Sequence, residues 1–101
     1  MKNTFELNKL IEYPKSGILS KVLIKAENNE VTLFCMAHGS EMSEHTSTKA
    51  GYVNVLEGEG VFNLKGKKIK MTKGTLIYME KNSVHSLKAK TNTSFLLTLI
   101  K

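Results

Sequence analysis

The chain has 101 residues, of which 41% are hydrophobic and 24% charged, and it contains a single cysteine. This composition fits one globular domain with its own core, and it excludes an internal disulfide framework. It also excludes a membrane-spanning run of roughly 20 apolar residues. Because the start of the chain lacks the apolar stretch of a secretory signal, we expect a cytoplasmic protein without membrane contact.

The net charge of +6 comes from fifteen lysines, and the sequence has no arginine. Recognition of bases and phosphates depends heavily on the planar fork of arginine, which lysine cannot supply. A barrel that binds single-stranded nucleic acid also needs aromatic side chains beside its basic ones. Phe62, near Lys65–Lys70, is the one candidate. We therefore rank nucleic acid last among the partners and interpret the lysines as a solvated surface.

In chain order, residues 1–17 form an N-terminal arm or edge segment, with either a short turn of helix or an irregular edge strand. Residues 18–101 form one β-barrel domain. Runs of β-forming residues between Gly- or Asn-containing breaks predict strands over 18–26, 31–37, 44–47, 50–57, 60–64, 67–71, 75–80, 84–90 and 94–100. Many short strands at nearly even spacing are typical of an antiparallel barrel or sandwich, so the predicted class is all-β.

The last predicted strand is apolar on both faces, in the run Phe95-Leu96-Leu97-Thr98-Leu99-Ile100. A strand that is exposed on one side alternates apolar and polar residues, whereas one that is apolar on both sides is covered on both. The inner face of this strand is covered by the core of the barrel. In so small a barrel, the simplest cover for its outer face is another subunit, so we predict a homodimer. A covering N-terminal segment from the same chain is the alternative.

Two sequence blocks resemble a known family. The first runs from Gly39 through His45 to Gly58, and the second runs from Gly74 to His85. Their spacing resembles the two motifs of the small single-domain, RmlC-like cupins (the cupin type 2 conserved barrel family), over residues 31–100. The resemblance implies a double-stranded β-helix, or jelly-roll barrel. It also implies a metal site, because family members commonly hold one divalent ion with three histidines and a glutamate.

This chain departs from that ligand set. His45 and His85 match two of the histidine positions, but Ser47 stands at another and Gly51 stands at the glutamate position. Two imidazoles leave half of a four-coordinate shell to water or substrate, whereas catalytic zinc sites usually keep three protein ligands. The resemblance therefore implies a degenerate site, at which Zn, Ni, Fe or Mn would be held only weakly by His45 and His85.

The same replacements bear on the barrel pocket. Exchanging a histidine and a glutamate for serine and glycine should enlarge the cavity and make it less charged. Barrel mouths are common small-molecule sites, mostly apolar with a few placed polar groups. The predicted pocket residues are His45, Ser47, Gly51, His85, Tyr52 and Tyr78.

Other reactive side chains receive simpler interpretations. Cys35 lies within a strand and is expected to be a buried small hydrophobe. Glu44 precedes His45 and, by strict alternation, points toward solvent unless a bulge turns it inward. Met42 or Met79 could join the histidines in a copper site, but methionines in strands are far more often core residues, and we expect that here.

Two classes of function remain open. The first is a non-catalytic or sensory cupin that binds a small organic molecule in the barrel pocket. The second is a metal-dependent isomerase, lyase or dioxygenase that uses His45 and His85, with water or substrate completing the shell and the metal acting as a Lewis acid. The missing ligands favour the first class. The sequence names neither the ligand nor a reaction.

Overall fold

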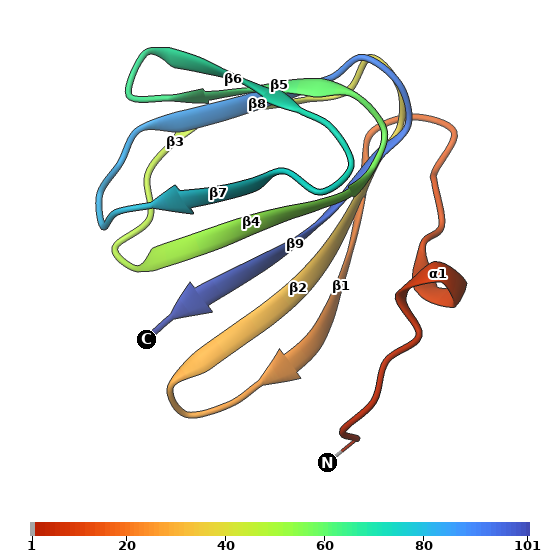
Figure 1. Cartoon of the computed structure of the whole chain (residues 1–101), viewed down its shortest axis with the longest axis vertical. Helices are drawn as coiled ribbons and strands as arrows, with labels where there is room; N and C mark the ends of the chain where they lie inside the picture. The colour runs from red at the N-terminus through yellow and green to blue at the C-terminus, as the bar shows by residue number, and fades with distance from the viewer. Residues whose placement is uncertain (1) are drawn as a thin grey trace.

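The computed structural model describes residues 2–101, which form two antiparallel sheets facing each other (Figure 1). A five-stranded sheet has the order β1-β2-β9-β4-β7, and a four-stranded sheet has the order β3-β8-β5-β6. Within residues 2–101, no helix is long and apolar enough to cross a bilayer. The described elements are α1 (Leu7–Leu10), β1 (Ile18–Lys25), β2 (Asn29–Met36), β3 (Glu41–His45), β4 (Ala50–Glu57), β5 (Gly60–Leu64), β6 (Lys67–Met71), β7 (Leu76–Met79), β8 (His85–Ala89) and β9 (Thr93–Ile100).

The all-β jelly-roll prediction is confirmed, and the strand that differs most from expectation is β3. The sequence predicts a strand from about residue 44, whereas β3 begins at Glu41. The run Glu-Met-Ser-Glu has few β-forming residues, and β3 owes its length to its pairing with β8. The register shifts between Met42 and His45, where β3 is bulged. Pairing with a neighbouring strand overrides weak local propensity here.

Strand alternation sends one set of apolar side chains into the space between the sheets. From the five-stranded sheet Phe34 and Phe95 stack on each other, with ring centroids 5.1 Å apart. From the four-stranded sheet Phe62 and Leu87 face them. The residues buried in this core are Met36, Val53, Val55, Phe62, Met71, Ile77, Met79, Leu87, Ala89 and Phe95.

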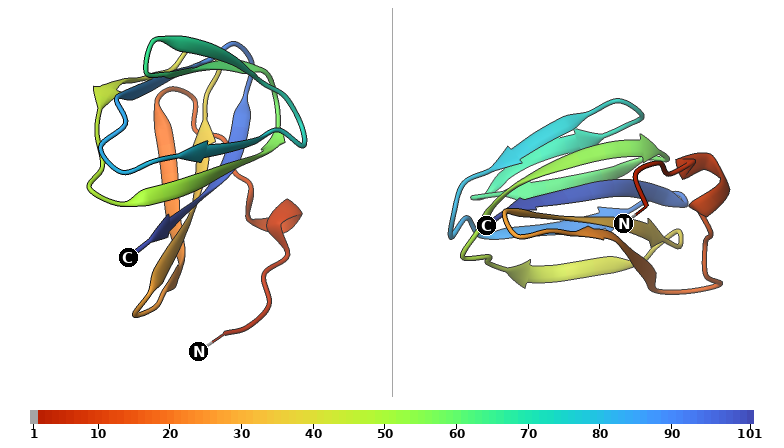
Figure 2. Two further views of the ribbon diagram at one scale, coloured as in Figure 1. Left: turned by 60° about the vertical axis from the view of Figure 1, so that its left-hand side comes forward. Right: turned by 90° about the horizontal axis from the view of Figure 1, so that it is seen from below.

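The N-terminal arm covers part of the outer face of the five-stranded sheet. Leu33 and Cys35 point away from the core and yet are fully buried, at 0% exposure. The arm is tied to the sheet by Tyr13, whose hydroxyl bonds Glu57 and lies 3.1 Å from Ser94 Oγ. Figure 2 shows the arm running beside β1 and β2. The arm from the same chain therefore supplies the second cover for this part of the sheet, and Cys35 is a buried small hydrophobe as predicted.

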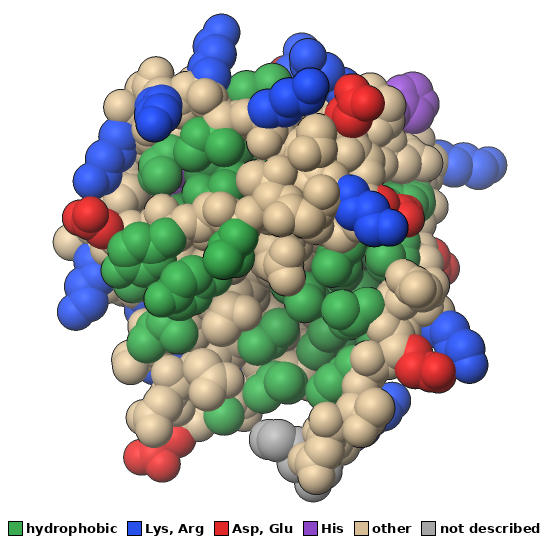
Figure 3. All heavy atoms as spheres, in the orientation of Figure 1, with side chains coloured by type: hydrophobic (Ala, Val, Ile, Leu, Met, Phe, Trp, Pro, Cys, Tyr) green, Lys and Arg blue, Asp and Glu red, His purple; other side chains and the backbone are tan. Residues whose placement is uncertain are grey.

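The rest of that outer face, over β4, β7 and β9, is apolar and open. Its exposed large side chains are Tyr52 at 41%, Leu76 at 65%, Tyr78 at 51% and Ile100 at 43%. Figure 3 shows hydrophobic side chains gathered at the surface over β4 and β7. The N-terminal arm leaves these side chains in contact with solvent.

Candidate functional site

The two motif histidines meet at one end of the barrel. β3 ends at His45 and β8 begins at His85, and the two residues are direct partners in the antiparallel register. Their ring centroids lie 4.1 Å apart in an edge-to-face arrangement. The loops that follow β3 and precede β8 are joined by a hydrogen bond from Asn82 N to the Ser47 carbonyl, at 2.7 Å. This end of the barrel lies at the left in Figure 1.

Both imidazoles are held in the same way by the backbone. His45 Nδ1 lies 2.7 Å from the Ser43 carbonyl oxygen, and His85 Nδ1 lies 2.9 Å from the Ser83 carbonyl oxygen. A carbonyl oxygen can only accept, so each Nδ1 must carry the hydrogen. In the neutral ring Nε2 is then a free acceptor, able to bind a proton donor or a metal ion.

A small cavity lies against these rings. Its volume is about 60 Å³. The two histidines are its polar side chains, and among the described residues no carboxylate lines it. The lining residues are Phe34, Met42, His45, Val53, Phe62, Met79, His85, Leu87, Phe95 and Leu97.

The two predicted tyrosines do not line this cavity. Tyr52 and Tyr78 are exposed on the outer face of the five-stranded sheet, with ring centroids 5.1 Å apart. The reason is strand alternation: Gly51 and Val53 face inward, so Tyr52 between them faces outward. Tyr78 pairs with Tyr52 across the two strands, so its side chain also points outward. Their assignment to the pocket was therefore wrong.

Ser47 and Gly51 lie near the barrel mouth but do not line the cavity either. Ser47 Oγ accepts a hydrogen bond from Lys49 N at 3.1 Å. A Cβ at Gly51 would lie 3.0 Å from Leu99 Cδ2 and 3.1 Å from the Thr98 carbonyl oxygen. Leucine side chains thus fill the space that a longer side chain at Gly51 would occupy, and the predicted enlargement of the pocket is not found.

Sequence reasoning missed most of the cavity wall, including Phe62. Its ring lies parallel to that of His85, with centroids 5.9 Å apart and an interplanar angle of 4°. Phe62 is only 1% exposed. It therefore cannot stack on bases, which removes the feature that motivated the nucleic-acid alternative. The period-two pattern along β5 signals an inward Phe62, but it gives no indication that the ring meets His85.

Burial lowers the pKa of His85 below its usual value, and the nearby His45 adds to that lowering, while the hydrogen bond to Ser83 opposes it. The His85 ring is therefore neutral at neutral pH, with Nε2 as an acceptor.

This lowered pKa predicts that the protein loses stability as the pH falls below about 6.5. In the unfolded chain His85 takes up a proton near pH 6.5, whereas in the fold it resists protonation to lower pH, so acid favours unfolding. Above pH 6.5 this contribution is constant. Urea unfolding between pH 5 and 8, with EDTA present, should give a shallower pH dependence for His85→Gln. The exposed His38→Gln variant is the control, and an unchanged slope in His85→Gln would contradict the prediction.

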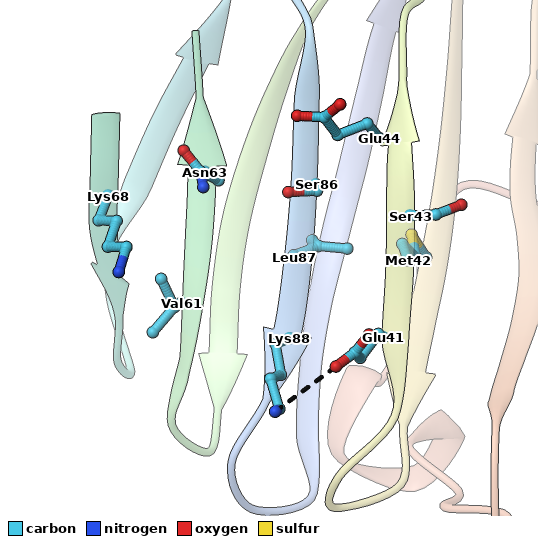
Figure 4. A pocket seen from close by; sticks show the side chains of 10 residues that line it. All are labelled: Glu41, Met42, Ser43, Glu44, Val61, Asn63, Lys68, Ser86, Leu87 and Lys88. Carbon is cyan, nitrogen blue, oxygen red and sulfur yellow. Dashed lines mark ion pairs between the residues drawn. The ribbon is translucent and has the colours of Figure 1, made fainter. Parts of the chain in front are cut away.

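A second and larger hollow lies on the outer face of the four-stranded sheet (Figure 4). Its volume is about 410 Å³, and it is lined from β3, β8, β5 and β6. Glu41 and Lys88 form an ion pair across its rim at 3.5 Å. Glu44 also lines it, so this carboxylate lies outside the barrel despite the bulge in β3. The groove is open to water and holds neither motif histidine, so we place the candidate site in the cavity beside His45 and His85 instead.

The comparisons with known proteins agree with this fold. The sequence profile of the Cupin domain family matches residues 32–101, which is more than half of the chain. The chain is a cupin. None of the curated proteins matches the sequence.

Several solved structures are similar to this chain in fold. A cupin 2 conserved barrel domain protein from Leptotrichia buccalis is 30% identical with a TM-score of 0.89, covering 96% of this chain and 47% of that one. A conserved protein of unknown function from Streptococcus pyogenes is 22% identical with a TM-score of 0.88, covering 100% and 89%. Salicylate 1,2-dioxygenase from Pseudoaminobacter salicylatoxidans is 17% identical with a TM-score of 0.78, covering 82% and 26%. At 22% and 17% identity, the last two show the fold alone.

The described residues of this barrel do not make up the four-ligand set with which cupins commonly hold a divalent metal. Within residues 2–101 there is no group of three or more His, Cys, Asp or Glu side chains that could hold an ion. The glutamate position is Gly51, over which Leu99 is packed, and the hydroxyl of Ser47 is bonded to Lys49 N. Mn prefers carboxylate and carbonyl oxygens, whereas imidazole suits Zn, Fe and Ni. Among residues 2–101 the cavity has two imidazoles and no carboxylate in its wall, so Mn fits it least of the predicted metals.

Proposed function

We propose that this cupin binds a small organic molecule in the barrel cavity, as a non-catalytic binding or sensory protein. The ligand has an apolar body and carries an N–H or O–H donor. The observation that carries the proposal is the pair of imidazoles, His45 and His85, each with Nδ1 used by the backbone and Nε2 free. They are the polar groups on an otherwise apolar wall.

The size of the cavity limits the ligand. About 60 Å³ accommodates roughly four to six non-hydrogen atoms, since one water occupies about 10–15 Å³ on the same measure. His45 is exposed while His85 is 7% exposed, so the cavity opens to solvent on the His45 side. A larger molecule can therefore be bound with one end in the cavity and the other in water.

The surroundings of the histidines support binding rather than turnover. General acid–base catalysis commonly pairs histidine with a carboxylate or another proton-transfer group within hydrogen-bond reach. The nearest carboxylate in sequence, Glu44, lines the outer groove. The thiol of Cys35 is fully buried on the outward side of the five-stranded sheet. Neither group lines the cavity.

Pyrrole and furan test this proposal, because they have the same shape and only pyrrole donates a hydrogen bond. We expect pyrrole to shift the NMR methyl signals of Val53 and Leu97, which line the cavity. We also expect it to bind about three- to tenfold more tightly than furan, the factor that one net hydrogen bond supplies.

Two variants connect the preference to the histidines. His85→Phe should reduce the preference for pyrrole, since one acceptor is lost while a ring remains. Tyr78→Phe changes an outward side chain and should leave the preference intact. Equal affinity for pyrrole and furan, the lack of any shift with either, or loss of the preference in Tyr78→Phe would reject the proposal.

A further inference from the structure

Two methionines line the same small cavity as the two histidines. Met42 comes from β3 and Met79 from β7, in opposite sheets. We propose that this cavity also binds one monovalent soft cation, Cu(I), through His45, His85, Met42 and Met79. This inference goes beyond the proposed organic ligand and does not depend on it, because the sulfur donors are not needed to bind such a molecule.

The imidazoles are already arranged as a pair of ligands. Each Nδ1 donates to a backbone carbonyl, and that bond fixes the ring and leaves the Nε2 lone pair free. Such a bond to the second ring nitrogen is the usual way in which proteins orient a metal-binding histidine. The ring centroids are 4.1 Å apart, so the two imidazoles are immediate neighbours on the wall of the same cavity.

The donor set selects the metal by its softness. Thioether sulfur and imidazole suit Cu(I), whereas Mg, Ca and Mn prefer carboxylate, carbonyl and water oxygens. Among the residues described, no carboxylate lines the cavity. A single positive charge also costs less to bury among apolar side chains than a double one. The features that make the barrel unsuitable for a hard dication therefore favour a soft monovalent ion.

Other methionines and the remaining thiol provide matched controls. Met36 and Met71 are each 1% exposed and belong to the core, but they do not line the cavity. Cys35 is a stronger ligand for Cu(I) than methionine, but it lies on the outward side of the five-stranded sheet, with 0% exposure. Replacing methionine with leucine keeps volume and apolarity and usually costs little stability.

The test is an anaerobic competition for Cu(I) between the whole protein and the chelator bicinchoninate, with ascorbate present. We expect one Cu(I) per chain, and a weakening of at least about tenfold in Met42→Leu, in Met79→Leu and in His85→Gln. Met71→Leu and Cys35→Ser should keep the wild-type affinity, and X-ray absorption should show sulfur as well as nitrogen ligands.

The inference is wrong if all copper stays with bicinchoninate, or if the spectrum shows no sulfur ligands. It is also wrong if Met71→Leu weakens Cu(I) binding as much as Met79→Leu does, or if Cys35→Ser abolishes binding. The pyrrole titration of Met79→Leu separates this inference from the proposed function. Retained pyrrole binding with lost Cu(I) binding supports both proposals. If the protein binds Cu(I) but does not bind pyrrole, the proposed organic ligand is rejected and the proposed metal site stands.

Discussion

Gly58→Ala is expected to remove a large part of the stability of the fold. Gly58 lies in the turn between β4 and β5 with φ at +96°, a conformation that L side chains rarely adopt. A Cβ there would lie 2.6 Å from Thr93 Cα and closer still to the Asn92 carbonyl oxygen. Crowding against backbone costs about 1–3 kcal/mol and the left-handed conformation about 1 kcal/mol more, so we expect a loss of about 2–4 kcal/mol.

Urea and thermal unfolding measure this loss, and Gly66→Ala separates its two causes. Gly66 has a similar φ of +83°, but nothing lies within 4 Å of its Cβ position. Gly66→Ala should therefore show the conformational cost alone, about 1 kcal/mol. If the two variants lose the same stability, crowding against the β8–β9 turn is not what requires glycine at position 58.

The second large effect concerns association. We propose that the open apolar face over β4, β7 and β9 is covered by a second copy of the chain, as the homodimer prediction requires. Apart from Glu57, which is bonded to Tyr13 of the arm, the outward side chains there are uncharged: Tyr52, Asn54, Leu76, Tyr78, Leu96, Thr98 and Ile100. On a chain of net charge +6, two copies repel each other least where they meet through an uncharged face.

A Leu76→Lys/Tyr78→Lys double variant should convert the dimer into a monomer, because it places charges in the middle of that face. Sedimentation equilibrium measures the mass directly. Val22→Lys is the matched control, since Val22 is 60% exposed on β1, away from this face. A wild-type protein that sediments as a monomer, or a dimer that survives the double variant, would contradict the homodimer.

Much of the fold follows from local patterns in the sequence. Period-two alternation and turn residues give the strand positions, because side-chain direction along a strand is fixed by the backbone itself. The observed bounds of β4, β5 and β6 equal the predicted 50–57, 60–64 and 67–71. The spacing of the motif glycines and histidines also led to the cupin family and to His45 and His85 as neighbours.

The contents of the cavity depend on contacts between distant parts of the chain. The sequence places Tyr52 and Tyr78 near the motif histidines, but alternation next to the inward Gly51 turns Tyr52 outward, and its cross-strand partner Tyr78 takes the same face. It shows Gly51 as a small residue, yet Leu97 and Leu99, from the far end of the chain, fill the space beside it. Core packing is close to that of a crystal, so space vacated by one side chain is usually taken by another.

The sequence alone therefore determined most of the strands, the family and the histidine pair, because each of these follows from local spacing, whereas β3 takes its bounds from its pairing with β8. Only the tertiary structure decided the rest. Packing of the two sheets brings Met42 and Met79 to the histidines and reduces the cavity to about 60 Å³. The N-terminal arm, and not another subunit, buries Leu33 and Cys35. These features depend on which distant side chains meet, and local patterns carry no information about that.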